Sequence, residues 1–331
     1  MRGKTACREP RRDAARAARW MLLCLLCSAR FSAEDRAARP EANPSAEDLV
    51  RQATANELKA QREDRRRWRF RLEWQRANAQ PDTYQVIQTT DGDLKRPVLL
   101  GGRPLTAEQK QQSDKQIEQL VRDPGPLRRD RARQTADAAR ILRLLTILPD
   151  ASNFTYGERR GDLVQLNFSP KPDFHPPSHE AEVFHAVAGS LWVELSKSRI
   201  EEMSGRLIHD VKFGGGILGH VNQGGTFEVK QGEVAPGSWQ LTEVKIEMQG
   251  KALFFKTIQV RQNYARSDFK PVPENLSVAE AAKMIEKQGL EDEAGPSSKP
   301  PARLRARDPV PANSNVIGEP AWAFWAGRAS K

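Results

Sequence analysis

The side chains that could do chemistry gather in one short stretch, where three histidines and two carboxylates fall within eleven positions. They are His175, His179, His185, Glu180 and Glu182. Imidazole and carboxylate groups are ligands of zinc, so a metal-dependent hydrolase is one hypothesis. Pro176-Pro177 predicts a loop, however, and not the helix that places the two histidines of HExxH on one face. We therefore interpret the three histidines as surface residues and weak candidate ligands, and expect neither metal nor cofactor.

Other reactive motifs have little support. The glycine run at 214–219 matches GxGxxG, but a turn and a strand are predicted after it instead of the helix that would hold a pyrophosphate. Its glycines fit the bending of a curved sheet better. No serine lies in a GxSxG elbow. Because all cysteines (Cys7, Cys24, Cys27) precede the expected cleavage site, no Cys–His pair survives processing. We expect a protein that is not an enzyme.

The first 33 residues have the pattern of a signal peptide. Arginines dominate its start, Trp20–Cys27 is a short apolar core, and small residues follow at Ser28, Ala29, Ser32 and Ala33. Residues 34–44 are then a linker. The prediction is an exported protein, either periplasmic or associated with the outer membrane. Loss of the leader removes eight basic and two acidic residues, which lowers the formal charge from +10 to +4. So small a value does not favour nucleic acid as a partner.

The elements that position these residues are mostly strands. From Asp162 to Val260, apolar and polar residues alternate in short runs separated by glycine-containing turns, and residues 67–74 alternate in the same way. This period of two is typical of antiparallel strands with hairpin turns. Capping patterns predict helices at 46–64, 106–122 and 278–288, and a further helix spans 127–148. We expect an α+β fold with a curved antiparallel sheet over residues 45–290, with a helical insert at 106–148.

The tail, residues 291–331, is rich in Pro, Ser, Ala and Arg, and its composition predicts disorder. Trp322, Phe324 and Trp325 are the exception. Aromatic residues without a core to bury them belong either to a frayed tail that packs loosely or not at all, or to a short docking motif for a membrane interface or an envelope protein.

A stripe of apolar side chains on the predicted strands, with three leucines of the insert, is the candidate ligand-binding surface. Its members are Trp68, Phe70, Leu72, Trp74, Trp192, Phe213, Phe227, Trp239, Phe255, Leu144, Leu145 and Leu148. Burial of a sixteen-carbon chain yields on the order of 10 kcal/mol at roughly 0.8 kcal/mol per methylene. A surface ion pair supplies only up to about 1 kcal/mol. A lipid-binding sheet therefore depends on its apolar face.

Several segments resemble one family. The strand 68–74, the hairpin at Asp91-Gly92 and the Gly-Gly-Arg-Pro-Leu-Thr segment at 101–106 match its beginning. The G-x-L-W-V-E strand at 189–194 and the Gly-Arg-Leu segment at 205–207 continue the match. The chain resembles, over about residues 45–265, the exported outer-membrane lipoprotein-sorting proteins and periplasmic lipoprotein carriers of bacteria. That resemblance implies an unclosed barrel with helices that cover its opening.

Three functions follow as hypotheses. The first is non-catalytic binding of a lipid or a lipid-modified protein on the apolar concave face of the sheet, under a helical lid. The second is an envelope interaction or sensor protein whose core stays closed. The third is the hydrolase built on His175, His179 and His185. The sequence favours the first.

Overall fold

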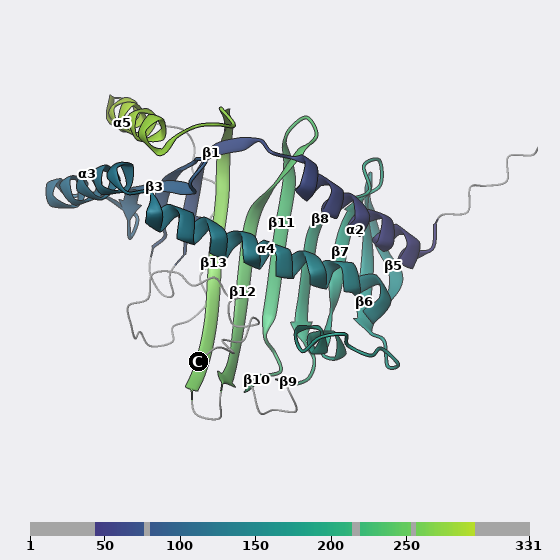
Figure 1. Ribbon diagram of the computed structural model, residues 1–331. Helices are drawn as coiled ribbons and strands as arrows, with labels where there is room; N and C mark the ends of the chain where they lie inside the picture. Colours follow the sequence, from purple (N-terminus) through teal and green to yellow (C-terminus); the bar gives the residue numbers. More distant parts are fainter. Residues whose placement is uncertain (1–43, 76–79, 214–218, 253–255, 295–331) are drawn as a thin grey trace, which may run out of the picture. The chain divides into compact units, whose positions relative to one another are not determined.

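The computed structural model describes residues 44–75, 80–213, 219–252 and 256–294 (Figure 1). In this part of the chain a large antiparallel sheet is combined with fewer helices, as the sequence predicts for an α+β fold. The helices are α2 (Ala46–Glu63), α3 (Ala107–Arg122), α4 (Gly125–Ala151), the 3₁₀ helix η1 (Glu180–His185) and α5 (Val278–Ala294). The signal peptide, residues 34–43 of the linker and the aromatic motif of the tail lie outside the described residues.

In the described residues the sheet has 13 strands with antiparallel pairings. Eleven of these strands follow one another in a single order, given next from one edge of the sheet to the other. Along the sheet they are β4 (Arg103–Pro104), β3 (Asp93–Leu100), β2 (Asp82–Gln88), β1 (Arg67–Trp74), β13 (Lys256–Val272), β12 (Ser238–Ala252), β11 (Thr226–Ala235), β8 (Arg199–Leu207), β7 (Val187–Glu194), β6 (Leu163–Pro170) and β5 (Ser152–Arg160). The short strands β9 (Val211–Phe213) and β10 (Gly219–Val221) attach to β12 through β10. Strands β4 and β5 form the two edges, so the sheet is not closed.

The local signals of the sequence produce these elements. Ser45 accepts a hydrogen bond from the Asp48 backbone at the start of α2, and Thr106 and Gln109 form a complete capping box at the start of α3. The Asp91-Gly92 turn joins β2 and β3 as predicted, with Gly92 at a φ of 144°. Only glycine adopts that angle without strain. Helix α4 runs three residues further than expected, with Pro149 inside its last turn.

One face of the sheet carries an apolar row that crosses seven strands. Residues directly opposite one another on paired strands point to the same face. The row is Leu166, Leu191, Met203, Val229, Val244, Tyr264 and Trp74. We call this side of the sheet the apolar face.

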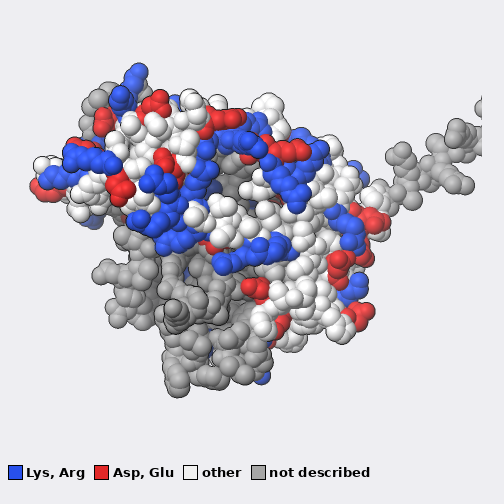
Figure 2. Space-filling view, in the orientation of Figure 1, with Lys and Arg blue, Asp and Glu red and all other residues white. Residues whose placement is uncertain are grey.

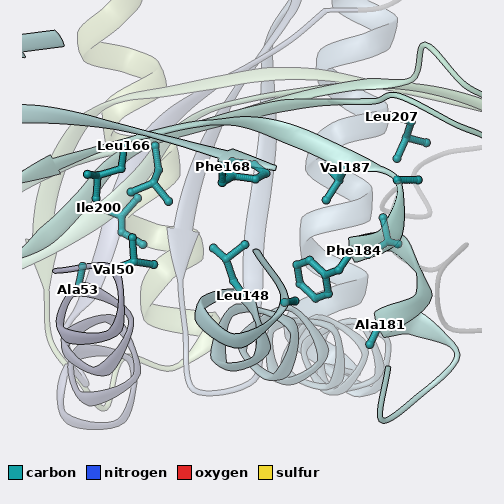
Figure 3. Close-up of a cluster of buried hydrophobic side chains, with 14 of the residues drawn as sticks. Val50, Ala53, Leu148, Leu166, Phe168, Ala181, Phe184, Val187, Ile200 and Leu207 are labelled. Atoms are coloured by element: carbon teal, nitrogen blue, oxygen red, sulfur yellow. The ribbon is translucent and has the colours of Figure 1, made fainter. Parts of the chain in front are cut away.

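The apolar face is packed most densely at the β5 end of the sheet. Here α2 contributes Leu49, Val50 and Ala53, and α4 contributes Leu148 and Ala151. They meet Leu166, Phe168, Val187 and Leu207 from strands β6, β7 and β8, as Figure 3 shows. Phe227 lies over Gly205, where a Cβ atom would come within 2.7 Å of its ring. This end of the molecule is therefore a filled hydrophobic core.

Two smaller cores lie at the β3 end of the sheet. One unites α3, α5 and the first turn of α4 with Ile87 and Leu94. The other consists of aromatic and aliphatic side chains of β1, β2, β13 and the β11–β12 hairpin, among them Trp68, Phe70 and Leu72. Since Ile87 and Val86 are neighbours on β2, these two cores occupy opposite faces of the same strands.

The face opposite the apolar face is charged in the middle of the sheet. Lys230 of β11 lies 2.9 Å from Glu228 and 3.6 Å from Glu202 and Glu243, and Lys245 lies 2.5 Å from Glu243. The hydrogen bond with Glu228, helped by the other carboxylates, raises the pKa of Lys230. The alternation of the strands thus separates one apolar and one ionic side.

Candidate functional site

Helix α4 crosses the sheet in front of β13, β12 and β11 (Figure 1), and both of its ends are fixed. At the N-terminal end, Arg128 binds Asp91 at 3.1 Å and Arg131 donates a hydrogen bond to the carbonyl of Thr90. These contacts explain the basic start of the helix, because they tie it to the β2–β3 turn. At the other end, Leu144, Leu145 and Leu148 pack in the core at the β5 end.

The middle of α4 is held less closely. Leu127, Gln134, Ile141 and Leu148 are seven residues apart and therefore lie on nearly the same side of the helix. Leu127 and Leu148, near the ends, are 6% and 1% exposed. Between them, Gln134 is exposed and the Ile141 side chain is 49% exposed. The side of α4 that is sealed at both ends is thus exposed at Gln134 and Ile141, although Asp137 between them is 3% exposed.

The sheet is also less buried below this part of the helix. In the apolar row, Leu166 and Leu191 are 0% exposed and Val244 is 5% exposed, whereas Met203, Val229, Tyr264 and Trp74 are half-buried. Half-buried positions are thus most frequent on strands β11, β13 and β1, away from the core that α2 and the end of α4 form with β6 and β7. The apolar face therefore has a filled half and a partly open half.

Helix α2 is fixed much more firmly than the middle of α4. Glu57 accepts two hydrogen bonds from Arg199 of β8, at 2.8 and 2.9 Å, and one from the Ile200 backbone at 3.0 Å. Both charged side chains are only 11% exposed. Asn56 donates to the carbonyls of Lys197 and Ser198. These contacts fix α2 against strand β8 of the sheet.

An arginine lies among the aromatic side chains of the open half. The Arg266 guanidinium lies 5.2 Å from the ring centre of Phe70 and 5.3 Å from that of Tyr264. Such stacking favours a cation over an aromatic face. The Arg266 Nε atom is buried without a hydrogen-bond partner, and so is the indole Nε1 of Trp68 in the same cluster. The apolar face therefore contains two unpaired donors.

Polar groups also surround α4. Burial raises the pKa of Asp137, although Arg140, 3.2 Å away, opposes that effect. On the outer side of the helix, Arg129, Arg133, Arg140 and Arg143 recur at helical spacing. Figure 2 shows Lys and Arg side chains gathered over α3 and α4. The helix is thus apolar or open toward the sheet and basic on its outer side.

The predicted ligand-binding residues do not all share one environment. Trp68, Phe70 and Leu72 are buried together, Trp74 lies half-buried beside Tyr264, and Phe227 and the three leucines belong to the filled core. Trp192 pairs with Gln165 and Glu202, on the charged face, under the Arg160 guanidinium at 4.2 Å. Trp239 lies beneath Lys197 and Arg199. Phe255 and the Phe213 side chain lie outside the described residues.

Trp192 is therefore the candidate that the structure removes from the apolar face. Its neighbour Leu191 points to the apolar face, and successive residues of a strand point to opposite sides. The alternation visible in the sequence carries this information, since Trp192 falls on the polar register of its strand.

The three histidines of the 175–185 stretch do not converge on a metal geometry. His179 Nδ1 lies 3.0 Å from a Glu182 oxygen, His175 Nδ1 lies 2.9 Å from the Asp173 carbonyl, and the His185 ring is tilted against the Phe174 ring, with their centres 5.9 Å apart. His185 instead lines a surface pocket of about 550 Å³ with His209, Asp210 and Lys212. Among the residues that the structure describes, no group of three His, Cys, Asp or Glu side chains is arranged to hold a metal ion.

Comparisons with known proteins identify no similar protein. No family model, curated protein or solved structure matches this chain. In the described ranges, no helix is long and apolar enough to cross a membrane. The site is therefore interpreted from its own geometry.

Sequence reasoning missed Arg266 and Glu57. Arg266 occupies an apolar position of β13, two residues after Tyr264, and a charge at such a position is a signal that the sequence does contain. Glu57 has no comparable signal, because its partner Arg199 is 142 residues away in the chain.

Proposed function

We propose that this protein is a non-catalytic binding protein for a lipid or a lipid-modified protein, which it holds on the apolar face of the unclosed sheet. The observation that carries the proposal is the partly open half of that face under the middle of α4. The half-buried row side chains Val229, Tyr264 and Trp74 and the exposed Ile141 supply apolar surface from both sides. Hydrocarbon gains about 0.8 kcal/mol per methylene buried on such surface.

In this proposal α4 is the movable cover of the opening and α2 is part of the fixed wall. The buried Glu57–Arg199 pair holds α2 against β8. The middle of α4 contains the buried Asp137, which pairs with Arg140 of the same helix, and the bonds at the start of α4 are made by exposed arginines. Displacement of the middle of α4 therefore costs less than displacement of α2. The bound acyl chain would then replace the contacts that α4 loses.

The resemblance to lipoprotein-sorting proteins supports this function and its location. With the leader-like first 33 residues, it favours an exported protein in the periplasm or at the outer membrane. In that compartment the ligand would be a lipid or the lipid anchor of another protein. Trp322, Phe324 and Trp325 would provide contact with an envelope partner.

Native mass spectrometry of the full chain after gentle purification tests the proposal. A lipid-binding protein should carry a lipid adduct, or acquire one when palmitate or lysophosphatidylglycerol is added. The fluorescence of N-phenyl-1-naphthylamine, a neutral apolar probe, should rise on binding and fall when either lipid competes. An adduct-free mass with every lipid, together with no response from the probe, would refute the proposal.

The second candidate is an envelope interaction or sensor protein with a closed core. The filled half of the apolar face favours it, because Leu166, Leu191 and Val193 are 0% exposed beneath α2 and α4. A pull-down from an envelope extract, with and without residues 291–331, addresses this function. Capture that depends on the tail and persists without any lipid adduct would favour it over lipid binding.

A further inference from the structure

The aromatic end of the apolar face contains an arginine without a partner of opposite charge. Within the described residues, the half-buried Arg266 side chain has no ion pair, its Nε atom is buried without a hydrogen-bond partner, and its guanidinium lies over the Phe70 and Tyr264 rings. By contrast, Arg261, five residues earlier on β13, lies 2.5 Å from Glu247 on the charged face. Of these two arginines on β13, the one on the charged face has a carboxylate partner and the one on the apolar face has none.

Leaving these donors without an acceptor is costly. A buried donor without an acceptor loses its hydrogen bonds to water and gains none in return. Trp68, 1% exposed, has an indole N–H in the same state, and Phe269 contacts both the Trp68 and the Phe70 rings. The aromatic cluster thus contains two N–H donors without a partner. A bound ligand could supply the hydrogen-bond acceptor that both donors lack.

The chemistry of the donors limits that acceptor. A guanidinium offers a planar fork of N–H groups that matches a carboxylate or a phosphate, and the hydrogen bonds it forms are charge-assisted. Tyr264 belongs to the apolar row, so an acyl chain that lies along the row toward Val244 would start beside Arg266. The site therefore suits a molecule with an anionic end and a long apolar tail.

We propose that Arg266, assisted by the Trp68 indole N–H, binds the anionic headgroup of an amphiphile whose acyl chain lies on the apolar face. This inference rests on the proposed lipid-binding function and adds to it the charge of the ligand and the residue that recognises it. The shared chemistry is an oxyanion, which a fatty-acid carboxylate or a phospholipid phosphate can supply.

Two fluorescent probes separate the headgroup from the chain. Cis-parinaric acid has an ionised carboxylate at pH 8, and N-phenyl-1-naphthylamine is neutral. In Arg266→Met, which keeps an unbranched apolar stem beside the rings, affinity for parinarate should fall about 10- to 100-fold, as expected for the loss of charge-assisted hydrogen bonds. Affinity for the neutral probe should change by less than about twofold, because its apolar contacts remain.

Matched variants complete the design. Arg261→Met removes the same side chain from the opposite face of β13 and should leave both affinities unchanged. Trp68→Phe removes the indole donor and should weaken parinarate binding selectively, by a smaller factor than Arg266→Met. Competition by palmitate, lysophosphatidylglycerol and hexadecanol then identifies the headgroup: palmitate indicates a carboxylate site, the lysophospholipid a phosphate site, and hexadecanol should compete poorly.

The possible failures are distinguishable. If the parent protein binds neither probe, the proposed function itself is overturned, and this inference falls with it. If both probes bind and Arg266→Met weakens them equally, or if Arg261→Met has the same effect, lipid binding stands and the role of Arg266 is wrong. Circular dichroism and the thermal midpoint of each variant establish that the compared proteins are folded.

Discussion

Single charged residues decide which parts of this protein are fixed. The Glu57–Arg199 pair joins α2 to β8 and also satisfies a backbone N–H at Ile200. Asp64, at the end of the same helix, accepts hydrogen bonds from Arg66 and Ser238, which outweigh the effect of its burial and lower its pKa. Both carboxylates connect α2 to strands far away in the sequence.

Glu57→Gln should destabilise the fold by about 3 kcal/mol, because it leaves the Arg199 charge buried without its counter-ion. Glu47→Gln is the control, since Glu47 pairs with Arg51 where both side chains are about half exposed. It should cost less than about 0.5 kcal/mol. Urea unfolding of both variants measures the difference. Equal and small losses would mean that the buried pair does not anchor α2.

Asp137→Asn should increase stability at neutral pH. Burial raises the pKa of Asp137 in the folded protein, so the stability that this carboxyl contributes is greatest when it is protonated and falls as pH rises through the folded pKa. The neutral amide avoids that loss. Thermal unfolding from pH 3 to pH 8 should show the variant's advantage above the folded pKa and none below about pH 3.9, the ordinary aspartate value. An advantage independent of pH would exclude this cause.

Among the elements, α4 has the least uniform environment. Its first turns are tied to the β2–β3 turn by arginines, its last turns are core, and Ile141 between them is 49% exposed. A helix held at two ends can move its middle without breaking the core. That property makes it the cover in the proposed function.

Ile141→Ala and Leu148→Ala should separate binding from stability. Leu148→Ala removes a side chain that is 1% exposed and should cost about 2–4 kcal/mol. Ile141→Ala should cost less than about 1 kcal/mol, because half of the side chain is already in water. If Ile141 contacts the acyl chain, its truncation should weaken N-phenyl-1-naphthylamine binding several-fold with the fold intact. Unchanged binding in a folded Ile141→Ala protein would show that α4 does not touch the ligand there.

For the molecule as a whole, the separation of an apolar and an ionic side is the dominant property. Cross-strand neighbours from Leu166 to Trp74 form one continuous apolar row, while Lys230, Lys245 and their carboxylates occupy the reverse side. A ligand that binds the apolar face of the folded state stabilises the entire sheet by mass action.

Palmitate at 100 times its dissociation constant should therefore raise the free energy of unfolding by about 2.7 kcal/mol. Shorter fatty acids should bind more weakly, by roughly fourfold for each methylene removed, since each contributes about 0.8 kcal/mol. Urea unfolding with fatty acids of eight to sixteen carbons measures both effects. No stabilisation at any chain length would indicate a closed core and favour the interaction protein.

Local sequence was sufficient for the elements and for the antiparallel pairing of the strands, whereas the unclosed sheet was implied only by the family resemblance. The period of two in Trp68, Phe70 and Leu72, and the Asp91-Gly92 turn, are short-range properties that the backbone obeys whatever surrounds it. The same alternation already placed Trp192 opposite Leu191, so its position on the charged face was available from the sequence.

Contacts between residues far apart in the sequence could not be predicted from local patterns. The pairing of β1 with β13 brings Phe70 to Arg266, and the crossing of α4 leaves Ile141 exposed between two buried leucines. Neither fact follows from local pattern, because residues nearly two hundred positions apart meet only when the whole sheet is assembled. The chain's pattern thus determined that an apolar face exists, and three-dimensional packing decided which half of it is filled and which charge lies within it.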